Sequence, residues 1–409
     1  MPIYEILFSA LSSIRQNKVR SFLTLLGVII GVFSIIGVMT AINILQSALE
    51  TNLSVIGSNN FYIQKYPAIQ MGGHDRRKYH NRKNLTYTDY QKLKEKVKLA
   101  DFISAEEWHG GDPVKYGNQQ TKRNVTIIGT TPEWEYTSGF FLSEGRMLIN
   151  DDLSQRRAVA LLGYDVAALL FPNEYPIGKQ VSIRGKKYNI VGLLDKKGAV
   201  FGQSEDNRVV IPITTHLQQF GTPWSSLGYT ITVSKAEHFQ DAMDEVTYHL
   251  RHIRKVPLGE ENDFEIVTNA GLLDTFNQVT AAIKLAALLI SSIALLAAGI
   301  GIMNIMLVTV TERTKEIGIR KSLGARRKSI LQQFLLEAII LTMIGGLFGI
   351  ILGVAAGNIL ALIMKIKVLI PWAWAFIGLM VTSVIGAVFG TYPAIKASAL
   401  DPIEALRYE

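Results

Sequence analysis

The chain is 409 residues long, 48% of them hydrophobic, and it contains no cysteine. The lack of cysteine excludes a disulfide framework, and the long uncharged apolar runs exclude an ordinary soluble protein. The formal net charge of +8 would suit nucleic acid, but the cations concentrate beside the apolar runs and in one polar loop. That placement favours a role in membrane topology and predicts no nucleic-acid partner.

Residues 1–20 predict an amphipathic helix at the cytoplasmic face of a membrane. Apolar residues recur at helical spacing, and Arg15, Lys18 and Arg20 follow directly before an apolar run. A signal peptide is the alternative, but its apolar core would span only about 7–15 residues. The run over residues 21–49 is roughly twice that, which favours an uncleaved first transmembrane helix.

Four windows carry no charged residue, and each is longer than the roughly 20 residues that cross a bilayer. They are residues 21–49, 285–311, 338–364 and 368–395. The sequence therefore predicts a membrane domain of four helices. The excess length of the first two helices predicts stalks that continue beyond the membrane.

A long polar region, residues 50–277, separates the first span from the second and predicts one large extracytoplasmic α+β domain. With the amino terminus inside, this insertion lies outside. Its own positive charge does not oppose that placement, because long domains cross the membrane regardless of charge. We expect two lobes, the first from residues 50–105 and 226–275 and the second from residues 106–225.

Short alternating segments in the insertion predict strands. Residues 181–184 and 188–193, around Gly185, predict one hairpin, and residues 114–116 and 124–128 predict another.

Residues 71–84 carry almost no apolar side chains and many cations, which predicts a mobile loop. His74, Asp75 and His80 do not form a regular set of ligands, so we expect no metal there.

Residues 278–311 predict the second stalk and transmembrane helix, and residues 330–364 predict the third helix. Glu337 is the single charge near the third span, and we expect it at the membrane interface. Glycine at every fourth position of the third span gives a smooth face for tight helix packing, and the first span has a similar spacing. The glycines expected to pack are Gly27, Gly31, Gly345, Gly349, Gly353 and Gly357.

Residues 365–371 predict a short outer loop, and Trp372 and Trp374 then suit an interfacial anchor. The fourth transmembrane helix is expected over residues 372–393. The tail, residues 394–409, is expected to be cytoplasmic.

Residues 312–329 form a basic stretch between the second and third spans. Glu312 and Glu316 fall about one helical turn apart, and Gly324 suits the end of a helix. Short loops rich in Lys and Arg lie on the cytoplasmic side. Two interpretations remain open: the cations only fix topology, or the helix presents a charged face to a soluble partner.

Motifs for nucleotide binding and hydrolysis are missing from the sequence. It contains no G-x-x-x-x-G-K-[ST], no H-E-x-x-H and no G-x-S-x-G. Its spans carry no paired ionisable residues of the kind that relay protons. We therefore expect no catalytic residue, no metal, no cofactor and no enzyme activity on this chain.

Residues 311–338, TERTKEIGIRKSLGARRKSILQQFLLEA, resemble the cytoplasmic signature of MacB/FtsX-type ABC transporter permeases. Four further segments are similar to other parts of the family pattern, in the expected order: residues 17–32, 56–63, 156–194 and 392–407. The resemblance is closer to the MacB-like members than to FtsX itself. MacB-type chains carry an ATPase domain on the same chain, and this sequence has none, so the ATPase is expected on a separate subunit.

The resemblance implies a homodimeric permease in a bacterial cytoplasmic membrane, surrounded by membrane lipid, with both termini inside. Two ABC ATPase subunits, which bind ATP and Mg, would flank it. The helix over residues 312–329 would dock on them as a coupling helix, and ATP-driven closure would move the outer domains by mechanotransmission. The residues carried over to this docking role are Glu312, Arg313, Glu316, Gly318, Arg320, Gly324 and Ala325.

Two functions of different classes follow from the resemblance. The first is export of a drug, peptide, lipid or similar substrate, with an extracytoplasmic adaptor protein as a further partner. The second is an FtsX-like regulator that signals to an outer enzyme or senses an antibiotic. The long outer domain resembles the export-type layout and favours the first.

Overall fold

The computed structural model describes residues 18–56, 59–67, 76–200, 203–364 and 367–407. The expected interfacial helix over residues 1–20 lies, up to residue 17, outside these ranges. The chain divides into two compact units, one formed by Met1–Ser47 with Asn277–Glu409 and the other by Ala48–Phe276. Each unit is described below by itself.

Four helices in the described part of the chain are long and apolar enough to cross a membrane. Their uncharged sequences favour helix, because a helix satisfies its own backbone hydrogen bonds where lipid offers none. They are α2 (Lys18–Ile56), α10 (Asn269–Glu312), α12 (Arg327–Ile363) and α13 (Trp372–Ala399). At about 1.5 Å per residue, the 44 residues of α10 extend roughly 66 Å, about twice the hydrocarbon thickness of a bilayer.

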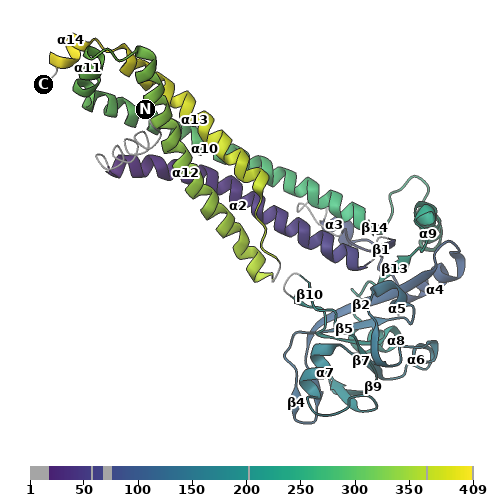
Figure 1. Cartoon of the computed structure of the whole chain (residues 1–409). Helices are drawn as coiled ribbons and strands as arrows, with labels where there is room; N and C mark the ends of the chain where they lie inside the picture. The colour runs from purple at the N-terminus through teal and green to yellow at the C-terminus, as the bar shows by residue number, and fades with distance from the viewer. Residues whose placement is uncertain (1–17, 57–58, 68–75, 201–202, 365–366, 408–409) are drawn as a thin grey trace. The chain divides into compact units, whose positions relative to one another are not determined.

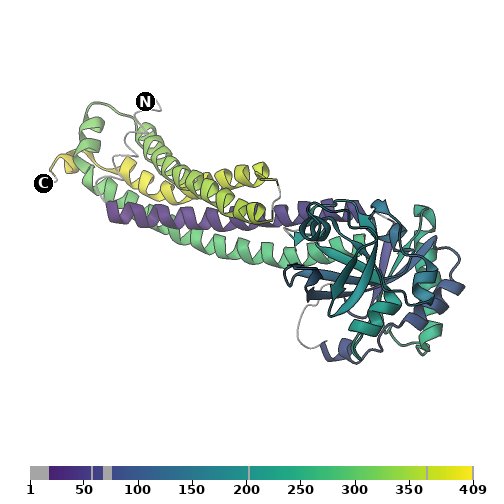
Figure 2. The same ribbon diagram turned by 90° about the horizontal axis from the view of Figure 1, so that it is seen from below.

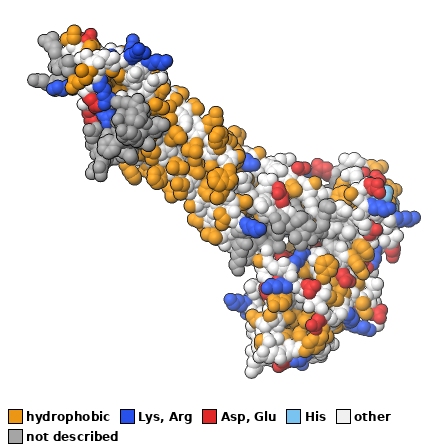
Figure 3. Space-filling view, viewed as in Figure 1, with side chains coloured by type: hydrophobic (Ala, Val, Ile, Leu, Met, Phe, Trp, Pro, Cys, Tyr) orange, Lys and Arg blue, Asp and Glu red, His pale blue; other side chains and the backbone are white. Residues whose placement is uncertain are grey.

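The helical unit has its own core, in which α2, α10, α12 and α13 lie side by side (Figures 1 and 2). Two short helices complete it, α11 (Thr314–Ser322) and α14 (Pro402–Arg407). The buried residues at its centre include Val32 and Ile36 of α2, Ile302 of α10 and Phe334 of α12. Hydrophobic side chains cover much of its outer surface, whereas Lys and Arg gather at the end where α11 and α14 lie (Figure 3).

The fourth long helix does not end near Pro393, as the sequence had suggested. Pro393 lies inside α13, which continues to Ala399. A proline removes one backbone hydrogen bond and crowds the preceding turn. The last turns nevertheless stay helical because Ala394 and Ala397 are fully buried in the core and Lys321 binds the carbonyl at the end of the helix.

The other unit is an α+β domain built on one large sheet. Among the described residues its strand order is β14-β1-β13-β2-β5-β12-β7-β9-β8-β3-β4, with β6 paired to β9, and β10 and β11 form a separate pair. The strands are β1 (Asn60–Gln64), β2 (Phe102–Asp112), β3 (Val114–Tyr116), β4 (Gln119–Gln120), β5 (Val125–Thr130), β6 (Leu142–Gly145), β7 (Val159–Leu162), β8 (Gln180–Ile183), β9 (Lys186–Leu194), β10 (Ala199–Val200), β11 (Gln203–Ser204), β12 (Arg208–Pro212), β13 (Gly228–Thr232) and β14 (Glu265–Thr268).

Helices cover this sheet and divide its core into clusters. They are α3 (Arg76–His80), α4 (Tyr87–Lys96), α5 (Trp134–Ser138), α6 (Asn150–Ser154), α7 (Tyr164–Leu170), α8 (Ile213–Phe220), the 3₁₀ helix η1 (Ala236–His238) and α9 (Phe239–Arg254). One cluster packs α4 and α9 on β1, β2 and β13, and another packs α7 and α8 on β5, β7, β9 and β12. Strand β2 runs through the lobe boundary expected at residue 105, so one sheet extends through both lobes.

Four apolar helices with an α+β domain between the first and second confirm the predicted fold class. The hairpin around Gly185 is also confirmed, since β8 pairs antiparallel with β9 and Gly185 adopts a positive φ of 83°. The second hairpin, expected around Gly117 and Asn118, does form there, since β3 pairs antiparallel with β4 and Gly117 adopts a positive φ of 53°. Its second strand was assigned wrongly, because residues 125–130 form β5, which pairs with β2 and β12.

The expectation of a mobile loop over residues 71–84 is wrong for residues 76–84, and residues 71–75 lie outside the described ranges. Helix α3 forms there, and the Arg82 guanidinium donates to the carboxylate of Glu265 at 2.8 Å and to the carbonyl of Lys65 at 3.0 Å. Asn84 accepts a hydrogen bond from Lys65 and donates one to the carbonyl of Pro223. Polar side chains fix this segment through partners far away in sequence.

Candidate functional site

Helix α11 joins α10 to α12 and is the element that carries the basic motif. Arg313 separates α10 from α11 with backbone angles of −100° and 17°. At the other end Ala325 N–H donates to the carbonyl of Arg320 and Gly324 N–H donates to that of Lys321, both at 3.0 Å. This is a Schellman cap, and it requires the positive φ of 91° that Gly324 supplies.

One face of α11 is buried within the chain. Thr314, Ile317 and Gly318 lie on this face. Gly318 therefore contributes to packing inside the unit. The sequence had assigned it to close approach by a partner.

The opposite face of α11 mixes charged and apolar side chains that are open to solvent. Glu312, Lys315 and Glu316 are exposed there. Between and beyond them, Ile319 is 47% exposed and Leu323 is 83% exposed. An exposed apolar ridge bordered by charges is the usual anatomy of a docking surface.

Two arginines of the motif make contacts inside the chain. Arg320 donates to Gln333 of α12 at 2.9 Å and forms an ion pair with Glu316 one helical turn earlier. Arg313 lies 3.3 Å from a carboxylate oxygen of Glu337. The Glu337 side chain is 0% exposed, so the structure buries the acid that we expected at the membrane interface.

Lys321 is a functional candidate that the sequence did not single out. Its ammonium donates to the carbonyls of Ser398 and Leu400 at 2.7 and 2.6 Å, where α13 ends. A cation suits the carboxyl end of a helix, where unpaired carbonyls and the helix dipole are negative. Burial and the nearby Arg327 lower the pKa of Lys321. No local pattern announces this contact, because its partners lie nearly eighty residues later in the sequence.

Helix α14 lies against α11 and widens its exposed surface (Figure 1). The Asp401 carboxylate accepts from the backbone N–H of Ile403 at 2.8 Å and so orders the first turn of α14. Ala405 is buried, whereas Ile403 is exposed. Helix α14, which lies against α11, therefore carries an exposed apolar side chain of its own.

The predicted glycines lie where helices approach closely. The stripe on α12 faces α2: a Cβ at Gly345, Gly349, Gly353 or Gly357 would lie 3.1, 2.8, 2.9 or 2.5 Å from Val28, Val32, Ile36 or Thr40. Gly27 and Gly31 face α10, where a Cβ would lie 3.0 Å from Ala298 and 2.8 Å from Leu295. These glycines bring α2 close to two other helices.

Among the described residues, no group of three or more His, Cys, Asp or Glu is arranged to hold a metal ion. The described helical unit thus combines tightly packed helices with exposed charged and apolar side chains on α11 and α14.

Protein-family models match most of the chain. The model of the MacB-like periplasmic core domain matches residues 21–248, and that of the FtsX-like permease C-terminal domain matches residues 288–402.

Curated relatives match along the full length of the chain. The macrolide export ATP-binding/permease protein MacB of Bdellovibrio bacteriovorus is 32% identical over 407 residues, covering 99% of this chain and 62% of its own. The MacB protein of Marinobacter nauticus is 35% identical and covers 99% of this chain and 61% of its own. The uncharacterized ABC transporter permease YknZ of Bacillus subtilis is 33% identical over 415 residues, with both chains covered in full. The chain thus spans about three fifths of the MacB relatives and the whole of the YknZ relative.

Two solved structures of related outer domains are also similar. The periplasmic region of MacB from Actinobacillus actinomycetemcomitans has a TM-score of 0.45 and 21% identity, covering 56% of this chain and 97% of its own. The extracellular domain of the transporter YknZ from Gram-positive bacteria has a TM-score of 0.41 and 16% identity, covering 51% of this chain and 100% of its own.

Proposed function

The chain belongs to the MacB-like and FtsX-like family of ABC transporter permeases, and from that premise we propose that it couples ATP hydrolysis on a separate subunit to movement of its outer domain. It is a multi-pass membrane protein with an extracytoplasmic α+β domain. In this proposal the outer domain acts on a substrate already outside the membrane, by mechanotransmission. The substrate is a drug, peptide, lipid or similar compound.

The working assembly in this proposal is a homodimer of the permease with two copies of an ATPase, which carry the ATP and Mg. An adaptor protein engages the outer domain. Exposed Arg326, Arg327 and Lys328 next to α11 support a cytoplasmic position for this end of the helical unit, because short cytoplasmic loops concentrate Lys and Arg. In this proposal both termini lie on the cytoplasmic side.

The observation that carries the docking role is the exposure of three apolar side chains on two adjacent helices, Ile319 and Leu323 at α11 and Ile403 on α14. Helices α11 and α14 lie at the end of the helical unit where Lys and Arg gather (Figures 1 and 3). A partner that covers these side chains would gain hydrophobic contact, and Lys315 and Glu316 beside them would supply charge-assisted contacts at the rim.

Substitution of Leu323 by Asp tests the docking role. Leu323 is 83% exposed, so the change should leave the helical unit folded while placing a charge in the proposed interface. We expect the ATPase rate of the assembled complex in lipid nanodiscs to fall about tenfold or more, because losing one buried anchor weakens an interface by over 1 kcal/mol. Glu316→Ala and Arg320→Ala should lower the same rate.

Leu258→Asp is the matched control. Leu258 is fully exposed in the α+β domain, so the same change there should leave the ATPase rate unchanged. An unaltered rate in Leu323→Asp, with ATPase still bound, would show that the partner does not cover this ridge.

A further inference from the structure

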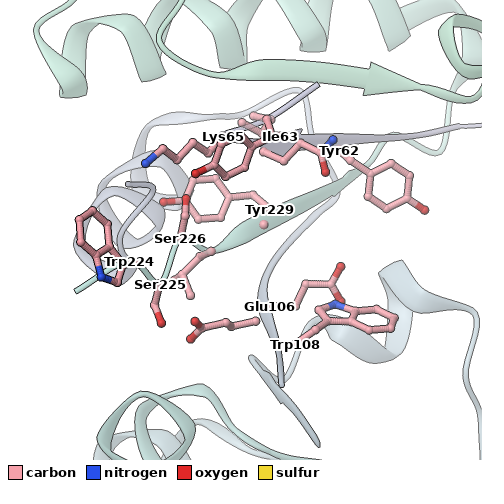
Figure 4. A pocket seen from close by; sticks show the side chains of 14 residues that line it. Tyr62, Ile63, Lys65, Glu106, Trp108, Trp224, Ser225, Ser226 and Tyr229 are labelled. Carbon is pink, nitrogen blue, oxygen red and sulfur yellow. The ribbon is translucent and has the colours of Figure 1, made fainter. Parts of the chain in front are cut away.

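A cavity of about 440 Å³ opens beside three neighbouring strands of the α+β domain, β1, β13 and β2 (Figure 4). Side chains alternate across these strands: Phe61 and Ile63 enter the core under α4 and α9, so Tyr62 points to the opposite face. The register places Tyr62 beside Thr230, and Glu106 follows on the next strand of the same face. A smaller cavity of about 110 Å³ shares Tyr62, Glu106 and Trp108 with the first.

Aromatic side chains border the larger cavity and remain open to solvent. Trp108 is 55% exposed and Trp224 is 72% exposed, and the two lie on opposite sides of the cavity in Figure 4. Tyr62 and Tyr66 add further rings to its lining, whereas Tyr229, which also borders it, is buried in the core. Large rings left this exposed around a concave site offer faces on which a ligand can stack.

Glu106 is the acid of this site, and its hydrogen-bond donors are neutral. Trp134 Nε1 donates to one carboxylate oxygen at 3.2 Å, and the Thr230 hydroxyl donates to the other at 3.4 Å. Among the described residues no Lys or Arg nitrogen forms an ion pair with it. The positive charge of Arg208 lowers the pKa of Glu106 through space. The Arg208 guanidinium itself forms an ion pair with the Glu205 carboxylate and donates to the Glu205 backbone carbonyl.

Each of the other charged groups in the lining of the larger cavity has a polar side chain close to it. Lys65 donates to Asn84 at 2.8 Å, and Glu107 lies 3.4 Å from His216. The lining of the larger cavity therefore contains one positive and two negative residues. The smaller cavity, which shares Glu106, is lined in addition by Lys197, Glu205 and Arg208, but none of the described Lys or Arg side chains forms an ion pair with Glu106.

We propose that this cavity binds an organic ammonium group carried on an apolar body, with Glu106 as its counter-ion and the rings of Trp108 and Tyr62 as its walls. A half-buried carboxylate gains most from a cation that brings little bound water, and aromatic faces attract such a cation as well. An anion would meet two carboxylates. A small divalent metal ion would need about six oxygen ligands, which this site does not offer.

The inference goes beyond the proposed coupling function and does not depend on it, because binding is measurable without an ATPase. The test uses the full chain in lipid nanodiscs and isothermal titration with benzyltrimethylammonium. Benzoate and benzyl alcohol serve as anionic and neutral probes of similar size. We expect saturable binding of the ammonium, with affinity at least about tenfold above that of either other probe, a difference of ~1.4 kcal/mol or more.

Two variants locate the binding. Glu106→Gln removes the charge and keeps the size of the side chain, and Trp108→Ala removes an exposed ring, so each should lose about tenfold in affinity. Glu237→Gln and Tyr248→Ala change exposed residues outside the cavity and should bind as the parent chain does.

Equal affinity in the parent chain and Glu106→Gln, or benzoate binding as tightly as the ammonium, would overturn the proposal. Absence of ammonium binding by a folded parent chain would overturn it too. Thermal unfolding of every variant shows whether lost affinity reflects the cavity or lost folding.

Discussion

Glu106 and Glu337 are both acids in largely apolar surroundings, but they are compensated differently. Glu337 lies 3.3 Å from the guanidinium of Arg313. Glu106 has an indole and a hydroxyl as donors, and burial raises the pKa of its carboxyl group. A group without a charged partner destabilises the fold where it ionises, and such groups often mark binding sites.

Substitution of Glu106 by Gln should therefore stabilise the α+β domain as pH rises. The folded domain holds the Glu106 proton more tightly than the unfolded chain, so this contribution to stability is present below the ordinary value of 4.5 and is lost as pH rises through the raised pKa. Gln cannot ionise and escapes that loss. Thermal unfolding across a pH series should show Glu106→Gln more stable than the parent at neutral pH and above.

Two other ionisable side chains, Arg208 and Tyr62, interact with Glu106 and could in principle contribute to the pH dependence of stability. Arg208 faces it from β12, and burial raises the pKa of the Tyr62 hydroxyl on β1, with the Glu106 charge as a second cause. Both keep their protons through the neutral range. A stability gain that stayed constant at every pH, including below 4.5, would contradict the assigned ionisation of Glu106.

Arg313→Leu should be strongly destabilising. It removes a positive partner from a carboxylate that is 0% exposed, and breaking a buried pair from one side costs about 3–5 kcal/mol. The measurement is thermal or denaturant unfolding of the helical unit in nanodiscs.

The double variant Arg313→Leu with Glu337→Leu supplies the control for that prediction. If the two charges stabilise each other, the double variant should be more stable than Arg313→Leu alone. Simple additivity of the two single changes would show that the pair is not coupled.

At the scale of elements, α2 and α12 meet along a repeated contact. The four glycines of α12 oppose Val28, Val32, Ile36 and Thr40, which also recur every fourth residue on α2. Matching period on both helices allows the backbones to approach without gaps, and dispersion contacts accumulate along the seam.

Gly353→Val should separate these two helices. Its Cβ alone would lie 2.9 Å from the Cβ of Ile36, and overpacking of this kind costs typically 1–3 kcal/mol. Ala355→Val adds bulk two residues away on an exposed position of the same helix and serves as the control. Equal unfolding temperatures for both variants would rule out a tight seam at Gly353.

Elements were predictable where one local pattern decides them. The uncharged windows indicated α2, α10, α12 and α13, and the alternation around Gly185 indicated β8 and β9. The pairing of strand β5 was predicted wrongly because neither of its partners, β2 and β12, is adjacent to it in the sequence. Segment 76–84 was misjudged because polar composition alone does not reveal the distant Glu265 and Pro223 that hold it.

The candidate docking site shows the same limit. The sequence located α11 and its cap at Gly324, since charge, helical spacing and glycine are all local signals. It did not show that Arg313 turns inward to Glu337 or that Lys321 reaches Ser398. Tertiary contacts determine which charged side chains of a basic helix remain available to a partner. Only substitutions of those available side chains test docking directly.

At the scale of the whole molecule, the proposed coupling function divides the work between two kinds of subunit. The basic motif, the packed spans and the outer domain belong to one chain, whereas no nucleotide-binding motif occurs in its sequence. Co-purification of this chain with a separate ATPase subunit would support the proposed assembly.

Helix α13 is anchored at both of its ends. Before it begins, the Asn358 side chain of α12 accepts from the backbone N–H of Leu369 and donates to its carbonyl, both at 2.9 Å. Where it ends, the Lys321 ammonium donates hydrogen bonds to the carbonyls of Ser398 and Leu400. These hydrogen bonds link α13 to α12 at one end and to α11 at the other, so a displacement of α11 that preserves them would also move the carboxyl end of α13.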